Sequence, residues 1–419
     1  MTAGARKQFS RFLRWLGVLL GLYLAITLVL STVVDPWRIN AAPWALTSLD
    51  GSREISTNVR VGKAALANRG NWDAVILGSS RVEIGMDPGH PAFKGRRAVN
   101  LAMAAAMVYE TVAAGQYAID RNPGIRTMLI GIEPGDINTD FDNRAIVRFD
   151  LSPFSDNNRS IERSINQLIG GRSLIESVGV IQRHIRGGAP GRSPLGQWLT
   201  PGHPADTRAY TAAFIGLMAA SVPDQWEFRP PVLRREKADL VLGLLRRARR
   251  AGIEVHLFLP PQHALKLVHP ADDRPEKIGW EADFLALAAI CREANAEDAP
   301  GPAVRLWNFL EFNDATSVPL PIPGAAEKRM PGWLDLGHGQ KSVGDRVLNT
   351  IFGGRAGVEP DRIGTGLLDC DWAAYRAAWI GAHARYCAGH ADDVNWWRAL
   401  VAGAAGKPVI SSNDAEGEP

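Results

Sequence analysis

The chain has 419 residues, of which 46% are apolar and 22% are charged. This is the mixture of a globular protein with at least one large domain, and it excludes a chain that is disordered throughout. The formal net charge is only +3, so the composition gives no basic footprint for nucleic acid, and no nucleic-acid partner is expected.

The first element is an uncharged stretch of 19 residues, 16–34. A helix of this length crosses about 28 Å, close to the hydrocarbon thickness of a bilayer. Basic residues and no acids occur within residues 1–15, which predicts a cytoplasmic N-terminus and a main domain on the far side of the membrane. A cleaved signal peptide is the alternative, but the apolar run is long for one and no small-x-small site follows directly. We therefore expect a single-pass anchor in the bilayer of a bacterial inner membrane, with the main domain in the periplasm.

Residues 35–70 are expected to form a stalk and a leading helix. Five short apolar runs without alternation follow, as expected for strands buried on both faces; they are residues 73–77, 97–100, 127–132, 254–259 and 304–309. Helical patterns lie between them at residues 104–121, 231–251 and 280–294. This alternation predicts an α/β domain over residues 71–353, in which a parallel sheet is covered by helices on both faces.

Two segments depart from the alternation. Residues 138–224 are rich in Arg, Ser, Gly and Pro, with short helical runs, and we interpret them as a helical insertion above the carboxyl ends of the strands. Residues 354–419 are expected to be a partly helical, weakly ordered C-terminal extension. Cys370 and Cys387 lie 17 residues apart there, and a disulfide and two unpaired thiols are both open.

Ligands of an open parallel sheet bind at the carboxyl ends of its strands, so the residues after each strand are the ones to inspect. The first predicted strand is followed by Gly78, Ser79 and Ser80. A serine on such a turn is exposed beside backbone N–H groups that can stabilise the oxyanion formed by its attack. The structural alternative is a serine that only caps a helix.

A nucleophilic serine needs a base, and Asp335 and His338 precede the last predicted helix, residues 341–352. This spacing allows the carboxylate to hold one imidazole nitrogen while the other faces the serine. A histidine on a surface loop is the alternative.

A GDS-like turn after the first strand, together with D-x-x-H before the last helix, resembles the SGNH (GDSL) hydrolase family over roughly residues 71–353. The resemblance implies a three-layer, flavodoxin-like fold of the SGNH type. It also implies a catalytic triad of Ser80 as nucleophile, His338 as base and Asp335 as its partner.

Other blocks of the family differ here. The N-x-G-x-x-G block reads Asn100 to Ala105, with alanine in both glycine places. Ala105 can still donate its N–H if the turn does not require positive φ. Glu133 stands where the family has an oxyanion donor, which an anionic carboxylate cannot be, and the Asn100 amide is a substitute. These changes resemble the membrane-linked branch of the family that acts in alginate acetylation and teichoic-acid D-alanylation, and they also fit a non-catalytic relative.

Three further residues are expected to line the site. Arg81 faces an anionic or sugar substrate, or pairs with Glu83 or Glu133. Glu133 contacts substrate or caps the insertion, and His263, after the fourth strand, is a lining residue. The remaining histidines have no metal-ligand spacing, so we expect neither a metal nor a cofactor.

Two functions are open on these observations. The first is an extracytoplasmic serine esterase or O-acyltransferase, with an envelope polysaccharide or another acyl acceptor as partner and a membrane acyl-transfer protein as a further one. The second is a non-catalytic SGNH-like envelope protein that binds glycan or a membrane partner. A nucleotide-binding flavodoxin-like domain ranks third, because no Gly-rich phosphate loop follows the first strand.

Overall fold

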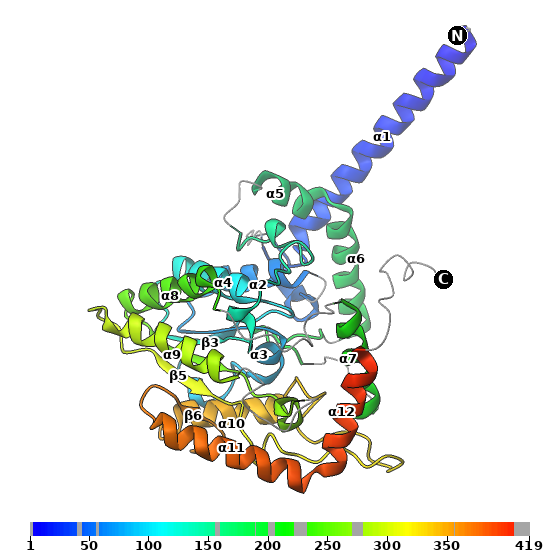
Figure 1. Cartoon of the computed structure of the whole chain (residues 1–419). Helices are drawn as coiled ribbons and strands as arrows, with labels where there is room; N and C mark the ends of the chain where they lie inside the picture. Colours follow the sequence, from blue (N-terminus) through cyan, green and yellow to red (C-terminus); the bar gives the residue numbers. More distant parts are fainter. Residues whose placement is uncertain are drawn as a thin grey trace. The chain divides into compact units, whose positions relative to one another are not determined.

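The computed structural model describes residues 3–39, 44–55, 58–155, 160–188, 190–199, 206–221, 233–269, 280–355 and 357–405 (Figure 1). The chain forms two compact units. The first consists of residues 1–70 and 143–194, and the second of residues 71–142 and 195–419. The stretch expected to be one helical insertion is therefore divided between them.

The second unit is built on a six-stranded sheet. Its strands are β1 (Ala74–Leu77), β2 (Ala98–Asn100), β3 (Thr127–Gly131), β4 (Glu254–Leu259), β5 (Arg305–Asn308) and β6 (Thr365–Gly366). The order is β2-β1-β3-β4-β5-β6, with the first five parallel and β6 antiparallel to β5. The five strands expected from apolar runs are all present, and their 2-1-3-4-5 order is that of flavodoxin-like, doubly wound sheets. The prediction of an α/β protein with a largely parallel sheet is confirmed.

Helices cover both faces of this sheet. On one face α4 (Val108–Arg121), α8 (Arg235–Arg250) and α9 (Trp280–Ala296) lie side by side against β1, β4 and β5 (Figure 1). Gly115 of α4 permits this packing, because a Cβ there would lie 2.9 Å from Leu244 and 3.0 Å from Leu77. On the other face α3 (Ser80–Gly85), the short 3-10 helix η3 (Pro91–Phe93) and α10 (Lys341–Phe352) share an apolar core with Ile76 and Phe258.

The C-terminal segment is a folded part of this unit, so the expectation of a weakly ordered extension is wrong for residues 365–405. It forms β6, α11 (Trp372–Gly389) and α12 (Ala391–Ala405). Trp379 donates its ring N–H to the carbonyl of Leu310 at 2.7 Å, and Trp397 donates to that of Val268 at 3.0 Å. Buried tryptophans with satisfied N–H groups bind both helices to the α/β core.

The same unit contains α7 (Thr207–Ser221) and the short 3-10 helices η4 (Asp136–Asn138) and η7 (Ala264–Leu267). Helix α12 contacts both α7 and η7. The end of the chain thus packs against α7 and against η7, the segment that follows β4.

The first unit is helical and contains the apolar N-terminal segment. Its elements are α1 (Ala3–Val33), η1 (Thr47–Ser52), α2 (Val59–Arg69), η5 (Phe149–Leu151), α5 (Ser160–Ile169) and α6 (Gly171–Arg186). Helix α1 is long and apolar enough to cross a membrane. It contacts α5 and α6 near its carboxyl end (Figure 1).

Candidate active site

The turn after β1 presents a serine at the carboxyl edge of the sheet. Gly78 has a φ of 148°, and a Cβ there would lie 2.6 Å from Val82, so the sharp turn requires glycine. Ser79 is the N-cap of α3, and its hydroxyl accepts a backbone N–H of the first turn at 3.3 Å. Capping is thus the role of Ser79, which leaves Ser80, the first residue of α3, for chemistry.

The loop before α10 holds an aspartate and a histidine in one tight turn. The N–H of Leu334 donates to the carbonyl of His338 at 2.9 Å and closes the loop. Oδ1 of Asp335 accepts the backbone N–H groups of Gly337 at 2.5 Å and of His338 at 2.9 Å. Its Oδ2 lies 2.8 Å from Nδ1 of the His338 imidazole. Three hydrogen bonds therefore fix the carboxylate, and the carboxylate fixes the ring.

These two segments meet across 258 residues of sequence. Oγ of Ser80 lies 2.9 Å from Nε2 of His338. With the Nδ1 proton on the Asp335 side, Nε2 is the acceptor for the Ser80 hydroxyl proton. Asp335 is buried, whereas Ser80 and His338 are half-buried and open to a substrate. The three residues expected from sequence to form a Ser-His-Asp relay are arranged as one.

The electrostatics keep Asp335 ionised. Burial on its own raises the pKa of this carboxyl, but the hydrogen bond and charge of His338 and the N–H of Gly337 outweigh burial and lower the pKa to about 2. An ionised Asp335 holds the imidazole in the tautomer that can take a proton from Ser80.

Arg81 and Glu133 link the turn that carries Ser80 to the loop that carries His338. Arg81 pairs with Glu133, which also accepts the hydroxyl proton of Ser79. Nε of Arg81 donates to the carbonyl of Gly337 at 2.9 Å. Of the alternatives for Arg81, the structure contains the ion pair with Glu133, and its guanidinium is engaged within the protein. Burial lowers the pKa of Arg81 to about 10, and the charge of Asp335 opposes this, so Arg81 remains a cation.

Two of the expected lining residues are structural. The amide nitrogen of Asn100 donates to the carbonyls of Val82 at 3.1 Å and Met86 at 2.9 Å, so both of its protons are used and it is no oxyanion donor. Nε2 of His263 lies 2.7 Å from the carbonyl of Val318, and its ring is fully buried. Burial lowers the pKa of His263 to about 4, so the ring is a neutral cap for η7 and does not line the site.

The turn after β2 lies beside the turn after β1. Met103 donates its N–H to the carbonyl of Gly78 at 2.9 Å, and the N–H of Ala104 donates to the Glu83 carboxylate at 3.1 Å. Ala105 has a φ of 58°. The turn does require positive φ, contrary to the condition set from the sequence. Alanine nevertheless adopts the left-handed conformation that glycine would have here.

Three residues near the relay were not predicted from the sequence. The ring of Phe214, on α7, packs edge-to-face on His338 with centroids 6.2 Å apart. Tyr210 lies one turn before it, and burial together with the Asp335 charge raises its phenol pKa. Lys266 is half-buried in η7, where burial and the charge of Arg81 lower its pKa to about 7. Only the place of Lys266 after β4 hinted at this neighbourhood, because α7 reaches the site through tertiary packing.

Close packing aligns the two halves of the relay. A Cβ on Gly344 of α10 would lie 1.8 Å from the carbonyl oxygen of Gly85, at the end of α3. Glycine at this point lets α10, which follows the His338 loop, approach the helix that begins with Ser80. The buried Trp333 and Leu336 anchor the loop in a cluster that includes Trp397 of α12.

No group of three or more His, Cys, Asp or Glu side chains that could hold a metal occurs in the parts of the chain that the structure describes. Of the two alternatives for Cys370 and Cys387, the structure has no disulfide between them.

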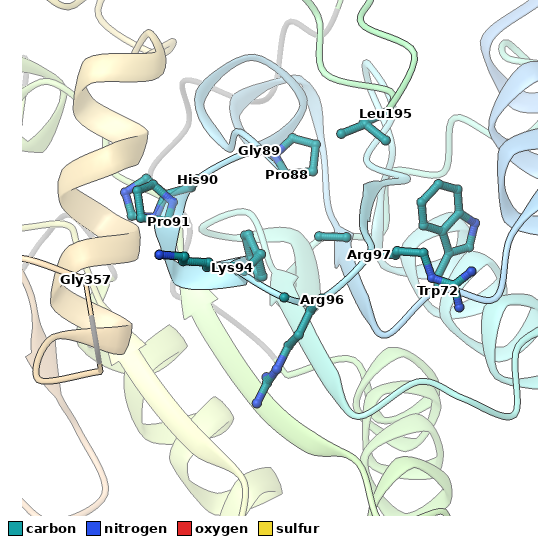
Figure 2. A pocket seen from close by; sticks show the side chains of 13 residues that line it. Trp72, Pro88, Gly89, His90, Pro91, Lys94, Arg96, Arg97, Leu195 and Gly357 are labelled. Atoms are coloured by element: carbon teal, nitrogen blue, oxygen red, sulfur yellow. The ribbon is translucent and has the colours of Figure 1, made fainter.

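A cavity of about 670 Å³ lies at the amino-terminal ends of β1 and β2, away from the relay (Figure 2). Its wall includes Trp72, Lys94, Arg96 and Arg97. In a parallel sheet all amino ends lie on one side and all carboxyl ends on the other. This cavity and Ser80 therefore lie at opposite ends of the strands.

No protein-family model, no curated protein and no solved structure matches the chain.

Proposed function

We propose that the chain is a membrane-anchored, extracytoplasmic serine esterase or O-acyltransferase of the SGNH type. The observation that carries the proposal is the 2.9 Å contact between Ser80 Oγ and His338 Nε2, with the other ring nitrogen 2.8 Å from Asp335. A nucleophile in contact with a base, which is itself oriented by a carboxylate, is the arrangement that activates a serine hydroxyl.

The first half-reaction forms an acyl-enzyme. Ser80 Oγ attacks the ester carbonyl carbon while His338 Nε2 takes the hydroxyl proton. The tetrahedral intermediate collapses as the C–O bond of the alcohol breaks, and His338 returns the proton to the departing alkoxide. Asp335 remains ionised and stabilises the imidazolium that exists between the two proton transfers.

The second half-reaction releases the acyl group. An incoming hydroxyl loses its proton to His338 and attacks the acyl carbon, after which Ser80 leaves and recovers that proton. Water as the incoming group gives an esterase, and the hydroxyl of a second substrate gives an O-acyltransferase. Phe214 over the imidazole favours transfer, because an apolar cover beside the base restricts water.

The oxyanion is assigned to backbone donors. The N–H of Ser80 is at the start of α3, where the first N–H groups of a helix have no intrahelical acceptor. The turn of Ala105, beside Ser80, has the left-handed backbone that glycine would give there. Glu133 is excluded from this role, since its carboxylate pairs with Arg81 and Ser79.

The membrane helix indicates the class of acceptor. Basic residues in the first half of α1, before its apolar stretch, favour a cytoplasmic N-terminus and a periplasmic main domain in a bacterial inner membrane. A tether is useful for an acceptor that stays in the envelope, and we propose an envelope polysaccharide, acylated in concert with a membrane acyl-transfer protein.

The test is labelling of the detergent-solubilised full chain by a fluorophosphonate, which reacts only with an activated serine. Labelling is expected in the wild type and in Ser79→Ala, and is expected to be lost in Ser80→Ala and His338→Ala. If a folded wild type is not labelled, the hydrolase proposal is wrong and the second reading, a non-catalytic envelope protein that binds glycan or a membrane partner, takes its place.

A further inference from the structure

Helices α5 and α6 expose apolar side chains that a water-facing surface would not favour. Ile161 and Ile165 of α5 are 74% and 51% exposed, and Ile175 and Ile185 of α6 are 70% and 77% exposed. In α5 the apolar residues recur at helical spacing and form one stripe, with Glu162 and Asn166 outside it. Helices of this kind lie at the boundary between headgroups and acyl chains.

The stripe of α5 is continuous with the surface of the membrane helix. One apolar groove, about 310 Å³ in volume, lies between the two helices. It is lined by Leu28 of α1 and by Ile161, Ser164, Ile165, Leu168 and Ile169 of α5. Leu28 and its neighbour Val29 are themselves exposed. An unbroken apolar surface therefore runs from the spanning helix onto α5.

Helix α6 fixes the depth at which this surface lies. Thr27 and Ser31 of α1 are buried, and Val34 packs with Val180 of α6. Near the start of α6, a Cβ on Gly171 would lie 3.4 Å from the hydroxyl of Tyr23. The contact thus runs from Tyr23 to Val34, about 17 Å along the helix, or roughly half of a hydrocarbon core of about 30 Å. Small residues at such a contact are typical of helix pairs within membranes.

The corner between α5 and α6 satisfies its own backbone groups. The hydroxyl of Ser173 lies 3.0 Å from the carbonyl of Asn166 and 2.7 Å from that of Gln167, in the last turn of α5. The N–H of Gly170 also donates to Asn166 at 3.2 Å. A helix end that is capped in this way needs little water, which is the condition for placing backbone in a lipid environment.

We propose that α5 and the exposed face of α6 lie in the outer leaflet of the bilayer that α1 crosses. The chain then has a spanning helix and an interfacial helical hairpin, and phospholipid acyl chains occupy the groove between α1 and α5. The inference rests on the membrane anchor of the proposed function. Because α1 and the hairpin are packed along half of the span, embedding the outer half of α1 carries the hairpin into the same leaflet.

The test uses the full chain in phospholipid nanodiscs, with spin labels on single introduced cysteines and with Cys370 and Cys387 replaced by serine. The labelled variants are Ile165→Cys in the stripe, Asn166→Cys on the polar side of the same helix, and Leu20→Cys on α1. Power saturation with oxygen, which partitions into lipid, is compared with a water-soluble nickel complex.

Oxygen is expected to relax the labels at Ile165 and Leu20 several-fold more than nickel does, and the ratio of the oxygen effect to the nickel effect is expected to be lower at Asn166 than at Ile165. A lipid-exposed Leu20 together with a nickel-accessible Ile165 would overturn the interfacial hairpin and leave the anchor intact. A nickel-accessible Leu20 would overturn the anchor, and the inference with it.

Discussion

Replacement of Asp335 by asparagine tests whether the carboxylate orients the base. The asparagine oxygen can still accept the backbone N–H groups that Oδ1 accepts from Gly337 and His338. Its amide N–H₂ replaces Oδ2, which lies 2.8 Å from Nδ1 of His338. A donor at that place turns the imidazole into the tautomer with its proton on Nε2, which then donates to Ser80 and cannot take its proton.

The expected loss follows from that change of tautomer. Reaction at Ser80 should slow by about 10⁴-fold, which corresponds to about 5 kcal/mol of activation free energy. Stability should fall by no more than about 2–3 kcal/mol, from the carboxyl pKa of about 2 against its ordinary 3.8. This contribution is present above pH 4 and lost as the pH falls towards 2, because the folded-state pKa is depressed.

The assay is the rate of phosphonylation by a fluorophosphonate at neutral pH, followed by intact mass, with thermal unfolding measured in parallel. The matched control is Asp314→Asn, because the Asp314 side chain is 77% exposed and lies outside the relay. A folded Asp335→Asn variant that reacts within tenfold of the wild type would refute the assigned role of the carboxylate.

Three other predictions concern packing and buried charge. Gly344→Ala should lower the free energy of unfolding by about 2–3 kcal/mol through overpacking and should weaken labelling of Ser80. The control Gly243→Ala, in open space on α8, should raise the free energy of unfolding by about 0.5–1 kcal/mol. Equal melting temperatures of the two variants would contradict this prediction. Burial raises the pKa of Glu311 to about 7, so its stabilising contribution is lost as the pH rises through 7, and Glu311→Gln should raise the melting temperature more at pH 8 than at pH 5. With its pKa lowered to about 7, Lys266 should be acetylated faster at neutral pH than the ion-paired Lys341, whose pKa is raised, as peptide mass spectrometry can show; a slower Lys266 would contradict its assigned environment.

The sheet and the relay could be predicted because their signals are local. The apolar runs of β1, β3 and β4 can be recognised without any information on distant residues. Asp335 and His338 are three residues apart, and this spacing indicates that the carboxylate can reach the imidazole. Ser80 follows from its place after a buried strand.

What could not be predicted depends on long-range packing. Arg81 has one acidic residue close by in sequence and another beyond the end of β3, and only the fold selects Glu133. Ala105 adopts a positive φ, for which a glycine would have been the sequence signal, so its left-handed backbone could not be predicted. The turn that contains it contacts the neighbouring turn after β1. The anchoring role of Trp397 is likewise invisible in a Gly- and Ala-rich tail, because its partners lie in segments far away in sequence.

The most direct test of the central claim is to trap the acyl-enzyme. The full chain in detergent is mixed with p-nitrophenyl acetate, quenched in acid within the burst of nitrophenol release, and mapped by peptide mass spectrometry. The relay geometry predicts one acetyl group on Ser80, present in the wild type and absent in His338→Ala. A folded wild type without acetyl on Ser80, or with equal acetylation in His338→Ala, would contradict it.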